Sequence, residues 1–564
     1  MGVLSKSIDK KWSFLSGAAL GVVAFIGIYG VNVLDPTYDD WLNCFAQDLT
    51  QHYMGWELYR ESAWHFPIGL CDRSCYPELS SVIYTDSIPL LCLFFKLLSP
   101  ILPETFQFFG MYGMFCFAMQ GGCAKLLLRH FFKDEIRLNV AALPFIFNIP
   151  FMQRMFYHTA LASHYLILSA FILFFNREKI AGLHRRLLCW CILGMVCISI
   201  HFTVYGIVSL MMLCFSVYDG LMEKRGIKRT VETVILYLAL YLASTVTVFY
   251  VFGGLYGDIS GDSYGLGVYS ANLNAFVDSR GFSKIIHQFP GFITQIEGFA
   301  YIGIAVILIG IPALIGFFKD IRSKKYGKET VYLTISIAVL CVLSVILAVS
   351  PVISLNDDVL FVYHLPKVIY DLWSIFRASG RFIWISMYVV ILFSVVYMQR
   401  LSKGSLWKKG SVFILFCLMI VQIFEYSDAF RMWYGWYGER RNISFSAEEL
   451  YNADLTGIKH IQFMNSYEFN DWYLGSVRDT VAGYTELAIK NDMTISNFHF
   501  SRGNMDKVNE QIVSSFNELV SGNPRTDTLY VFEKNDNYEI IKQKFIMEKV
   551  YELDTGTEIV LMAR

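Results

Sequence analysis

The chain has 564 residues, of which 55% are hydrophobic, 16% aromatic and only 17% charged. A soluble domain has roughly a quarter of its residues charged, so this composition excludes an ordinary soluble protein. The net charge of −1 also argues against a general nucleic-acid-binding protein, which needs a basic surface. Apolar runs recur along the first three quarters of the chain, and runs of about 20 residues can cross a bilayer as helices.

These runs predict a mainly α-helical, polytopic membrane protein with about eleven transmembrane helices. The first run lacks a small-residue cleavage signal, so we expect a membrane anchor rather than a removable signal peptide. The predicted spans lie near residues 14–34, 105–128, 138–153, 157–175, 187–202, 204–222, 231–252, 298–318, 330–350, 381–399 and 411–427.

The segment 87–102, SIPLLCLFFKLLSPIL, decides the orientation of the chain. It is short for a span and contains Lys96 and two prolines. If it lies in the membrane interface as an amphipathic in-plane segment, the loops rich in Lys and Arg all fall on one side. The positive-inside rule then places the N-terminus in the cytoplasm and the C-terminal segment outside it, in a plasma membrane. The predicted cytoplasmic loops are 129–137, 176–186, 223–229, 319–328 and 400–409.

The chain changes character after the last predicted span, because residues 429–564 are polar and charged. Helical patterns occur at SAEELYNAD and DKVNEQIVSSFNELVSG, and β-like runs at KHIQFMN, DTLYVFEK and TEIVLMAR. We therefore predict a transmembrane domain at 1–428, with a first outer loop at 35–104, and a small extracytoplasmic α/β domain at 429–564.

The first outer loop contains aromatic and apolar residues at helical spacing. They predict one or two interfacial helices with an aromatic side on the membrane, although an aromatic belt alone would give the same pattern. The residues are Trp41, Phe45, Leu49, His52, Tyr53, Trp56, Tyr59 and Trp64.

Asp48 is harder to explain as part of such a belt, because a carboxylate near hydrocarbon is costly unless it is paired or solvated. On a helix, Asp48, Gln51 and His52 share one face. A carboxylate held in this way could act as a general base or hold a divalent cation such as Mg²⁺ or Mn²⁺. The alternative is a solvated helix terminus that Asp48 caps.

Two arginines, Arg377 and Arg381, lie one helical turn apart at the start of a predicted span. Their forked guanidinium groups suit a phosphate or diphosphate. Alternatively, they reach to lipid phosphates or pair with Asp371. Arg154 and Glu297 stand at the outer ends of other predicted spans and could join the same site.

Three histidines lie near the outer ends of predicted spans, at His158, His164 and His201. They lack a strong metal-ligand spacing, so each is a candidate for polar support of the site or for simple packing. The outer loop also contains Cys71 and Cys75, which could form a short disulfide or remain two free thiols.

Several strings of the sequence resemble an uncharacterised bacterial family of polytopic membrane proteins. They are AQDLTQHYMGWELYR, FPIGL, YTDSIPLLCLFFKLLSPILPETFQFFG, HTALASHYLIL, QIEGFAYIG and FRASGRFIW. The layout of one span, a large acidic outer loop, an in-plane segment, further spans and an outer polar domain also resembles the GT-C membrane glycosyltransferases.

The GT-C resemblance implies transfer of a sugar from a polyprenyl phosphate or diphosphate, with a catalytic Asp in the first outer loop. Asp48 is the best match, and Asp35, Asp39 and Asp40 are rivals closer to the span. Members often have a second acid beside this Asp, whereas Leu49 follows Asp48 here.

The same resemblance assigns further roles, with an acceptor that is a glycan, a lipid or a protein and without nucleic acid. Asp86 or Glu297, with Gln51 and His52, would form the acceptor side. The donor phosphate would contact Arg377, Arg381 and Arg154.

Two other functions remain open from the sequence. A transporter or flippase of a lipid-linked envelope precursor would need charges buried within the spans and two related halves. The sequence has few such charges and no internal repeat. A non-catalytic envelope-assembly protein would differ from a glycosyltransferase only in an activity assay.

Overall fold

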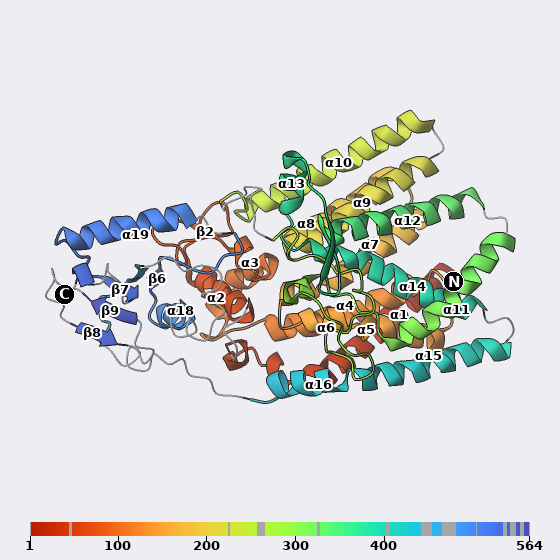
Figure 1. Ribbon diagram of the computed structural model, residues 1–564, viewed down its shortest axis with the longest axis horizontal. Helices are drawn as coiled ribbons and strands as arrows, with labels where there is room; N and C mark the ends of the chain where they lie inside the picture. The colour runs from red at the N-terminus through yellow and green to blue at the C-terminus, as the bar shows by residue number, and fades with distance from the viewer. Residues whose placement is uncertain are drawn as a thin grey trace.

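The computed structural model describes residues 2–43, 48–223, 226–256, 265–323, 327–401, 405–440, 454–464, 481–502, 505–533, 539–541, 549–552 and 558–562. These residues are mainly helical. Figure 1 shows a large helical bundle with the N-terminus at one end and a C-terminal sheet beyond the other end. The first outer loop lies between the bundle and the sheet.

The bundle is held together by close packing of neighbouring helices, with α1 on α4, α9 on α10 and α12, and α11 on α14. The bundle helices are α1 (Gly2–Tyr29), α4 (Phe109–Leu128), α5 (Glu135–Ile146), α6 (Ile149–Arg154), α7 (His164–Phe175), α8 (Leu183–Ile198), α9 (Phe202–Met222), α10 (Gly226–Val251), α11 (Ile304–Ser323), α12 (Lys328–Val349), α14 (Ile383–Leu401), α15 (Ser405–Glu425) and α16 (Ser427–Trp433).

Among the described residues, five helices are long and apolar enough to cross a membrane, and a sixth candidate is a bent helix pair. Several long apolar helices indicate a membrane protein. The candidates are Lys10–Tyr29, Phe202–Met222, Gly226–Val251, Lys328–Val349 and Ser379–Gln399, with the pair Gly410–Glu425 and Ser427–Gly438 bent by 52°. Other predicted spans, such as 138–153, form shorter helices, so the count of about eleven remains a prediction.

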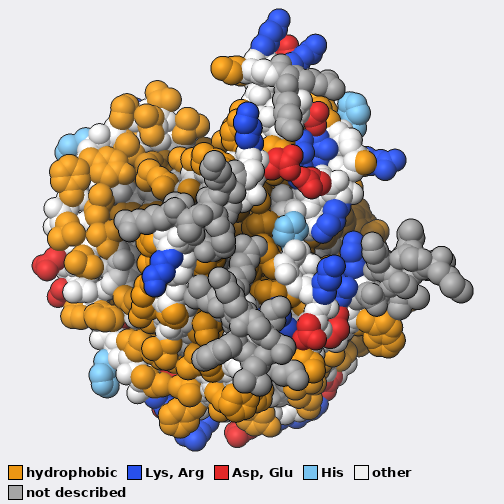
Figure 2. Space-filling view, turned by 90° about the vertical axis from the view of Figure 1, so that its right-hand side faces the viewer, with side chains coloured by type: hydrophobic (Ala, Val, Ile, Leu, Met, Phe, Trp, Pro, Cys, Tyr) orange, Lys and Arg blue, Asp and Glu red, His pale blue; other side chains and the backbone are white. Residues whose placement is uncertain are grey.

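Figure 2 views the end of the bundle that carries the N-terminus, and Lys and Arg side chains gather on one side of it. Ser13 of α1 donates a hydrogen bond to Glu135, which shows that the loop 129–137 lies beside the start of the chain. This basic loop and the start of the chain therefore lie at the same end of the bundle.

The helix α2 (Asp48–Glu61) carries the aromatic pattern of the first outer loop. The prediction of an interfacial helix with its aromatic side on the membrane is wrong, because residues 48–60 are all buried within the protein. Trp56 donates to the carbonyl of Phe106, and Tyr59 to the carbonyl of Ile68. Backbone carbonyls of neighbouring segments thus accept hydrogen bonds from these side chains, so α2 belongs to the core of the outer region.

The segment 87–102 forms α3 (Pro89–Leu98) followed by a 3₁₀ turn. Its helix has 10 residues and so is about 15 Å long, half the thickness of a bilayer core. Lys96 donates to the carbonyl of Tyr59 at 2.8 Å and to Ser62 at 2.7 Å. The charge in this apolar segment is therefore satisfied by the outer loop, as an in-plane segment requires.

The C-terminal residues form a five-stranded sheet with the order β6-β5-β7-β9-β8. β5 pairs in parallel with β6 and β7, and β9 is antiparallel to β7 and β8. The predicted β-like runs coincide with β5, β7 and β9, and one predicted helix with α19. The other, SAEELYNAD, lies almost wholly outside the described residues. The elements are β5 (His460–Phe463), α18 (Val481–Lys490), β6 (Thr494–Ile495), α19 (Met505–Val520), β7 (Thr528–Glu533), β8 (Lys549–Glu552) and β9 (Glu558–Met562).

This C-terminal sheet is attached directly to the first outer loop. The backbone of Ile495 donates to Arg73 and accepts from Tyr76, and the ring of Tyr76 stacks on His460 with centroids 4.0 Å apart. Two short hairpins complete the fold, β1 (Leu70–Cys71) with β2 (Ser80–Ser81), and β3 (Val352–Leu355) with β4 (Asp358–Val362). The C-terminal segment is thus positioned over the end of the bundle that carries the outer loop.

Candidate functional site

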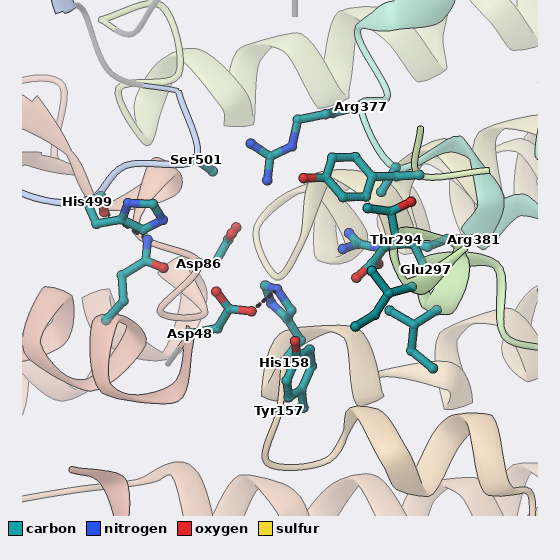
Figure 3. A pocket seen from close by; sticks show the side chains of 15 residues that line it. Asp48, Asp86, Tyr157, His158, Thr294, Glu297, Arg377, Arg381, His499 and Ser501 are labelled. Carbon is teal, nitrogen blue, oxygen red and sulfur yellow. Dashed lines mark hydrogen bonds and ion pairs between the residues drawn. The ribbon is translucent and has the colours of Figure 1, made fainter. Parts of the chain in front are cut away.

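One cavity of about 490 Å³ lies where the first outer loop, bundle loops and the C-terminal segment meet. In Figure 3, Asp48, Asp86 and His158 face Glu297 and Arg381 across the cavity, and Arg377 points in from a third side. Its polar lining residues are Asp48, Gln51, Asp86, Tyr157, His158, Tyr269, Thr294, Glu297, Arg377, Arg381, His499 and Ser501.

Asp48 is the first residue of α2, and only 8% of it is exposed. An Oδ2–Nε2 distance of 2.8 Å joins its carboxylate to His158. A carboxylate in the first turn of a helix is favoured by the helix dipole, and the histidine contact fixes its orientation. The structure therefore presents an oriented carboxylate to the cavity, and the orienting contact comes from His158, outside the helix that carries Asp48.

Asp86 reaches the cavity from a tight turn in which Asp86 and Ile88 both have positive φ, 54° and 61°. Ser87 donates a hydrogen bond to the carbonyl of His52 at 2.6 Å, which fixes the turn against α2. Gly55 permits this approach, because a Cβ there would lie 2.6 Å from Cβ of Thr85. The strained turn is maintained by its surroundings and presents a second carboxylate. Burial raises the pKa of Asp86.

Glu297 has a guanidinium on each carboxylate oxygen. Arg154 contacts Oε1 at 3.0 Å, and Arg381 contacts Oε2 at 2.6 Å. Burial by itself would raise the pKa of Glu297, but the two arginine charges lower it well below its usual range. Both oxygens contact guanidiniums, so Glu297 holds the two arginines in place, and its role on the acceptor side stays a prediction.

A close backbone contact holds Glu297 and Arg381 together. Glu297 lies in the 3₁₀ turn η7 (Ile293–Gly298), and Arg381 in η8 (Ser379–Phe382). A Cβ on Gly380 would lie 2.9 Å from Cα of Gly298, so only glycine lets the two turns touch. The strings QIEGFAYIG and FRASGRFIW therefore meet in space through their glycines.

Arg377 and Arg381 both line the cavity, but they do not share one helix face as predicted. Arg377 lies in a turn before η8, and its guanidinium is 5.5 Å from the ring centroid of Tyr269. The alternative pairing of these arginines with Asp371 is not observed in the described contacts, where Asp371 contacts Lys367 and Arg381 contacts Glu297. A turn and a 3₁₀ turn, rather than an α-helix, therefore aim both side chains into the cavity.

The C-terminal segment supplies lining residues that the sequence did not reveal, His499 and Ser501. Gln51 of α2 donates to the carbonyl of His499 at 2.8 Å, and Ser501 donates through its backbone to Tyr84 at 2.8 Å. Burial lowers the pKa of His499 to about 4, so its imidazole is neutral at physiological pH. No periodicity signals such a residue in a polar segment more than 400 positions from Asp48.

Several other residues predicted for the site lie outside the lining. Arg154 lies behind Glu297, and His201 lies behind Asp86 at 3.7 Å. His52 packs behind the cavity against His158, with ring centroids 5.0 Å apart, and burial lowers its pKa to about 3. His164 belongs to the bundle core, where it contacts the hydroxyl of Tyr388 at 2.8 Å.

The rival acids of the first loop are placed elsewhere, since Asp35, Asp39 and Asp40 do not line the cavity. Asp39 instead accepts a hydrogen bond from Tyr53 at 2.8 Å. The geometry therefore distinguishes Asp48 from its rivals. Cys71 and Cys75 are free thiols, so the disulfide alternative is wrong.

A second cavity of about 460 Å³ lies between α3, α4, α7 and α8 and has an almost wholly apolar lining. It includes Leu90 and Ile200. The backbone of Leu90 donates to the carbonyl of Ser199 at 2.8 Å, and His201 contacts Asp86. Ile200 of the apolar cavity therefore directly precedes His201, which contacts Asp86 of the polar cavity.

The fold and the site define a helical membrane protein with a polar cavity closed by its C-terminal segment. The chain belongs to the family described as "Domain of unknown function (DUF6311)", whose model matches residues 18–427. The model for the "DUF6311 C-terminal domain" matches residues 452–555. No curated protein matches the chain.

Proposed function

We propose that the protein is a membrane glycosyltransferase that moves a sugar from a polyprenyl-phosphate-type lipid to a cell-envelope or other extracytoplasmic acceptor. One observation carries the proposal: a single cavity joins Asp48 to Arg377 and Arg381. A carboxylate facing two guanidiniums matches a reaction in which a proton leaves the acceptor and a phosphate leaves the donor.

In the proposed reaction, Asp48 takes the proton from the acceptor hydroxyl or amine. The acceptor atom then forms a bond to the anomeric carbon, on the face opposite the phosphate. The bond between that carbon and the phosphate oxygen breaks, and its electron pair stays on the lipid phosphate. A phosphate is already a good leaving group, so stabilisation of its charge matters more than a strong general acid.

The arginines suit the leaving phosphate because of how they are held. Glu297 neutralises one charge of the pair Arg154 and Arg381, which leaves one net positive charge there. Arg377 adds a second, and its guanidinium also faces the ring of Tyr269. The positive charge therefore lies on the arginine side of the cavity, opposite the carboxylates of Asp48 and Asp86, so an anionic phosphate would lie against Arg377 and Arg381.

The apolar cavity supports a lipid donor. Its lining includes Phe95, Phe115, Tyr165 and Leu91, which could pack against an isoprenoid chain. It lies behind the turn that carries Asp86. In the proposal, the isoprenoid chain lies in this apolar cavity and the phosphate lies in the polar one.

The proposal includes the predicted sidedness, with about eleven spans, a cytoplasmic N-terminus and an extracytoplasmic C-terminal domain. The Lys and Arg side chains on the end of the bundle that carries the N-terminus support it. A tag after Arg564 should react with an impermeant reagent added outside intact cells. Reaction only after the cytosol is opened would contradict the topology.

The reaction can be tested with full-length protein in lipid vesicles that contain a panel of labelled polyprenyl-phosphate hexoses. We expect Asp48→Asn to reduce transfer about 10²–10⁴-fold, the usual contribution of a general base. Asp39→Asn is the matched control, since Asp39 lies in the same loop but outside the cavity, and it should keep wild-type transfer. Equal transfer by Asp48→Asn and the wild type, or no transfer from any donor, would refute the proposal.

A further inference from the structure

Three side chains at the back of the polar cavity form a cluster that the proposed reaction does not use. His52, Asp86 and His158 each bring one potential ligand atom to within 4.8 Å of the others. They come from α2, the strained turn after Tyr84 and the loop after α6. Because these segments are far apart in the sequence, only the folded protein assembles the cluster.

Three of the four ring nitrogens of these histidines have no hydrogen-bond partner in the described part of the protein. His52 is fully buried, and both of its ring nitrogens lack a hydrogen-bond partner among the described residues. Nδ1 of His158 is also buried without a described partner. Buried polar groups in proteins are normally paired, so two such rings in contact point to a site that binds a ligand.

Neighbouring residues hold the three side chains of the cluster in fixed orientations, as is usual for metal ligands. Asp48 contacts Nε2 of His158 at 2.8 Å, the carboxylate contact that commonly orients a metal-binding imidazole. His201 lies 3.7 Å from Asp86 on the far side of that carboxylate. Ser87 fixes the backbone of His52.

The donor set discriminates between cations. Two imidazoles and one carboxylate suit zinc and similar transition metals, whereas magnesium and calcium prefer oxygen ligands alone. A zinc ion with bonds of about 2.0–2.1 Å spaces tetrahedral ligands by roughly 3.3 Å. Side-chain rotations that close the cluster by about 1.5 Å would complete such a shell.

We propose that His52, His158 and Asp86 form a site for one divalent transition-metal ion of the zinc class. Asp86 and His158 line the cavity, so the fourth coordination position would open into it. An oxygen atom of the molecule in the cavity, or a water, would occupy that position. The site is independent of the glycosyl-transfer proposal, because metal binding is measured without a reaction.

The test uses full-length protein purified in lipid nanodiscs and stripped of metal with a chelator. Zn²⁺ is titrated by calorimetry, and Co²⁺ by its visible absorption, with folding checked by circular dichroism. We expect one ion per chain, at least tenfold weaker binding in His52→Ala and Asp86→Asn, and no competition from equimolar Mg²⁺. His65→Ala is the matched control, because His65 pairs with Asp72 at 3.0 Å away from the cavity and should bind as the wild type does.

A second pair of variants separates binding from folding. His52→Gln keeps a polar side chain of similar reach but offers an amide, so it should fold and still lose the absorption of bound Co²⁺. Asp48→Asn should weaken binding by about 10–100-fold through loss of the orienting carboxylate. Stoichiometric binding that His52→Gln leaves unchanged, or no stoichiometric binding by the wild type, would overturn the site.

Discussion

Two clusters of buried charges lie at opposite ends of α9, which has 21 residues and is therefore about 30 Å long. At its start, Thr203 accepts a hydrogen bond from Arg381 of the cavity cluster at 3.2 Å. Near its end, Asp219 is fully buried and contacts Arg177 at 2.6 Å and Arg186 at 3.0 Å. Both clusters place arginines and carboxylates within the bundle.

The clusters differ in how completely their polar atoms are paired. Tyr237 donates to Asp219 at 2.9 Å, and Glu223 contacts both arginines, so two acids balance two bases. The cavity cluster instead surrounds about 490 Å³ of space and contains buried histidine nitrogens without described partners. A closed cluster, whose polar atoms are all paired, stabilises a helix junction. A cluster with polar atoms that face a cavity has groups that can bind a ligand.

The largest expected effect tests the closed cluster. Asp219→Ala would leave Arg177 and Arg186 buried with too little negative charge, and we expect a loss of about 3–5 kcal/mol in stability. Thermal unfolding of detergent-purified protein, monitored by fluorescence, measures it. Substitution of an exposed acid such as Glu232 should change stability little, because it pairs only with exposed Arg229. A stable Asp219→Ala protein would remove the contrast between the clusters.

Glu297→Gln tests the part of the cavity cluster that is paired. The variant would leave Arg154, which is 1% exposed, without its charge partner, and we expect about 2–3 kcal/mol of destabilisation. It should also lower transfer, since Arg381 loses its orienting contact. A variant that is destabilised but transfers normally would show that Glu297 only supports the fold.

His499→Ala tests whether the C-terminal segment contacts the molecule in the cavity. The side chain lines the cavity, but its segment is held by backbone contacts to Gln51 and Tyr84, so the fold should be kept. We expect KM for the acceptor to rise about tenfold with kcat nearly unchanged, the sign of lost binding in both ground and transition states. A fall in kcat alone would assign His499 to the chemistry instead.

The smallest expected effect belongs to Tyr237→Phe. It removes one of the hydrogen bonds to Asp219 and leaves both arginine contacts. We expect a loss of about 1 kcal/mol in unfolding free energy and no change in transfer. A larger effect would mean that the closed cluster depends on its hydroxyl as much as on its charges.

Several residues singled out from the sequence line the candidate cavity, and others do not, for definable reasons. Asp48, Gln51 and Asp86 line the cavity with Arg377 and Arg381, because polar residues beside apolar runs collect at one end of a bundle. The misplaced interfacial helix shows the limit of that reasoning. The sequence pattern of an aromatic helix is the same whether lipid or protein covers the helix. The helix α2 is buried because segments that follow it in the sequence, such as α3 and α18, pack on it.

By itself, the sequence determined a membrane protein with long apolar helices and a polar C-terminal segment. These features follow from composition and local periodicity, which act over one helix at a time. Only the tertiary structure decided that Glu297 lies between Arg154 and Arg381, that His52 packs against His158, and that His499 lines the cavity. Such contacts join segments separated by up to several hundred residues, and packing between them, rather than any local pattern, fixes their geometry.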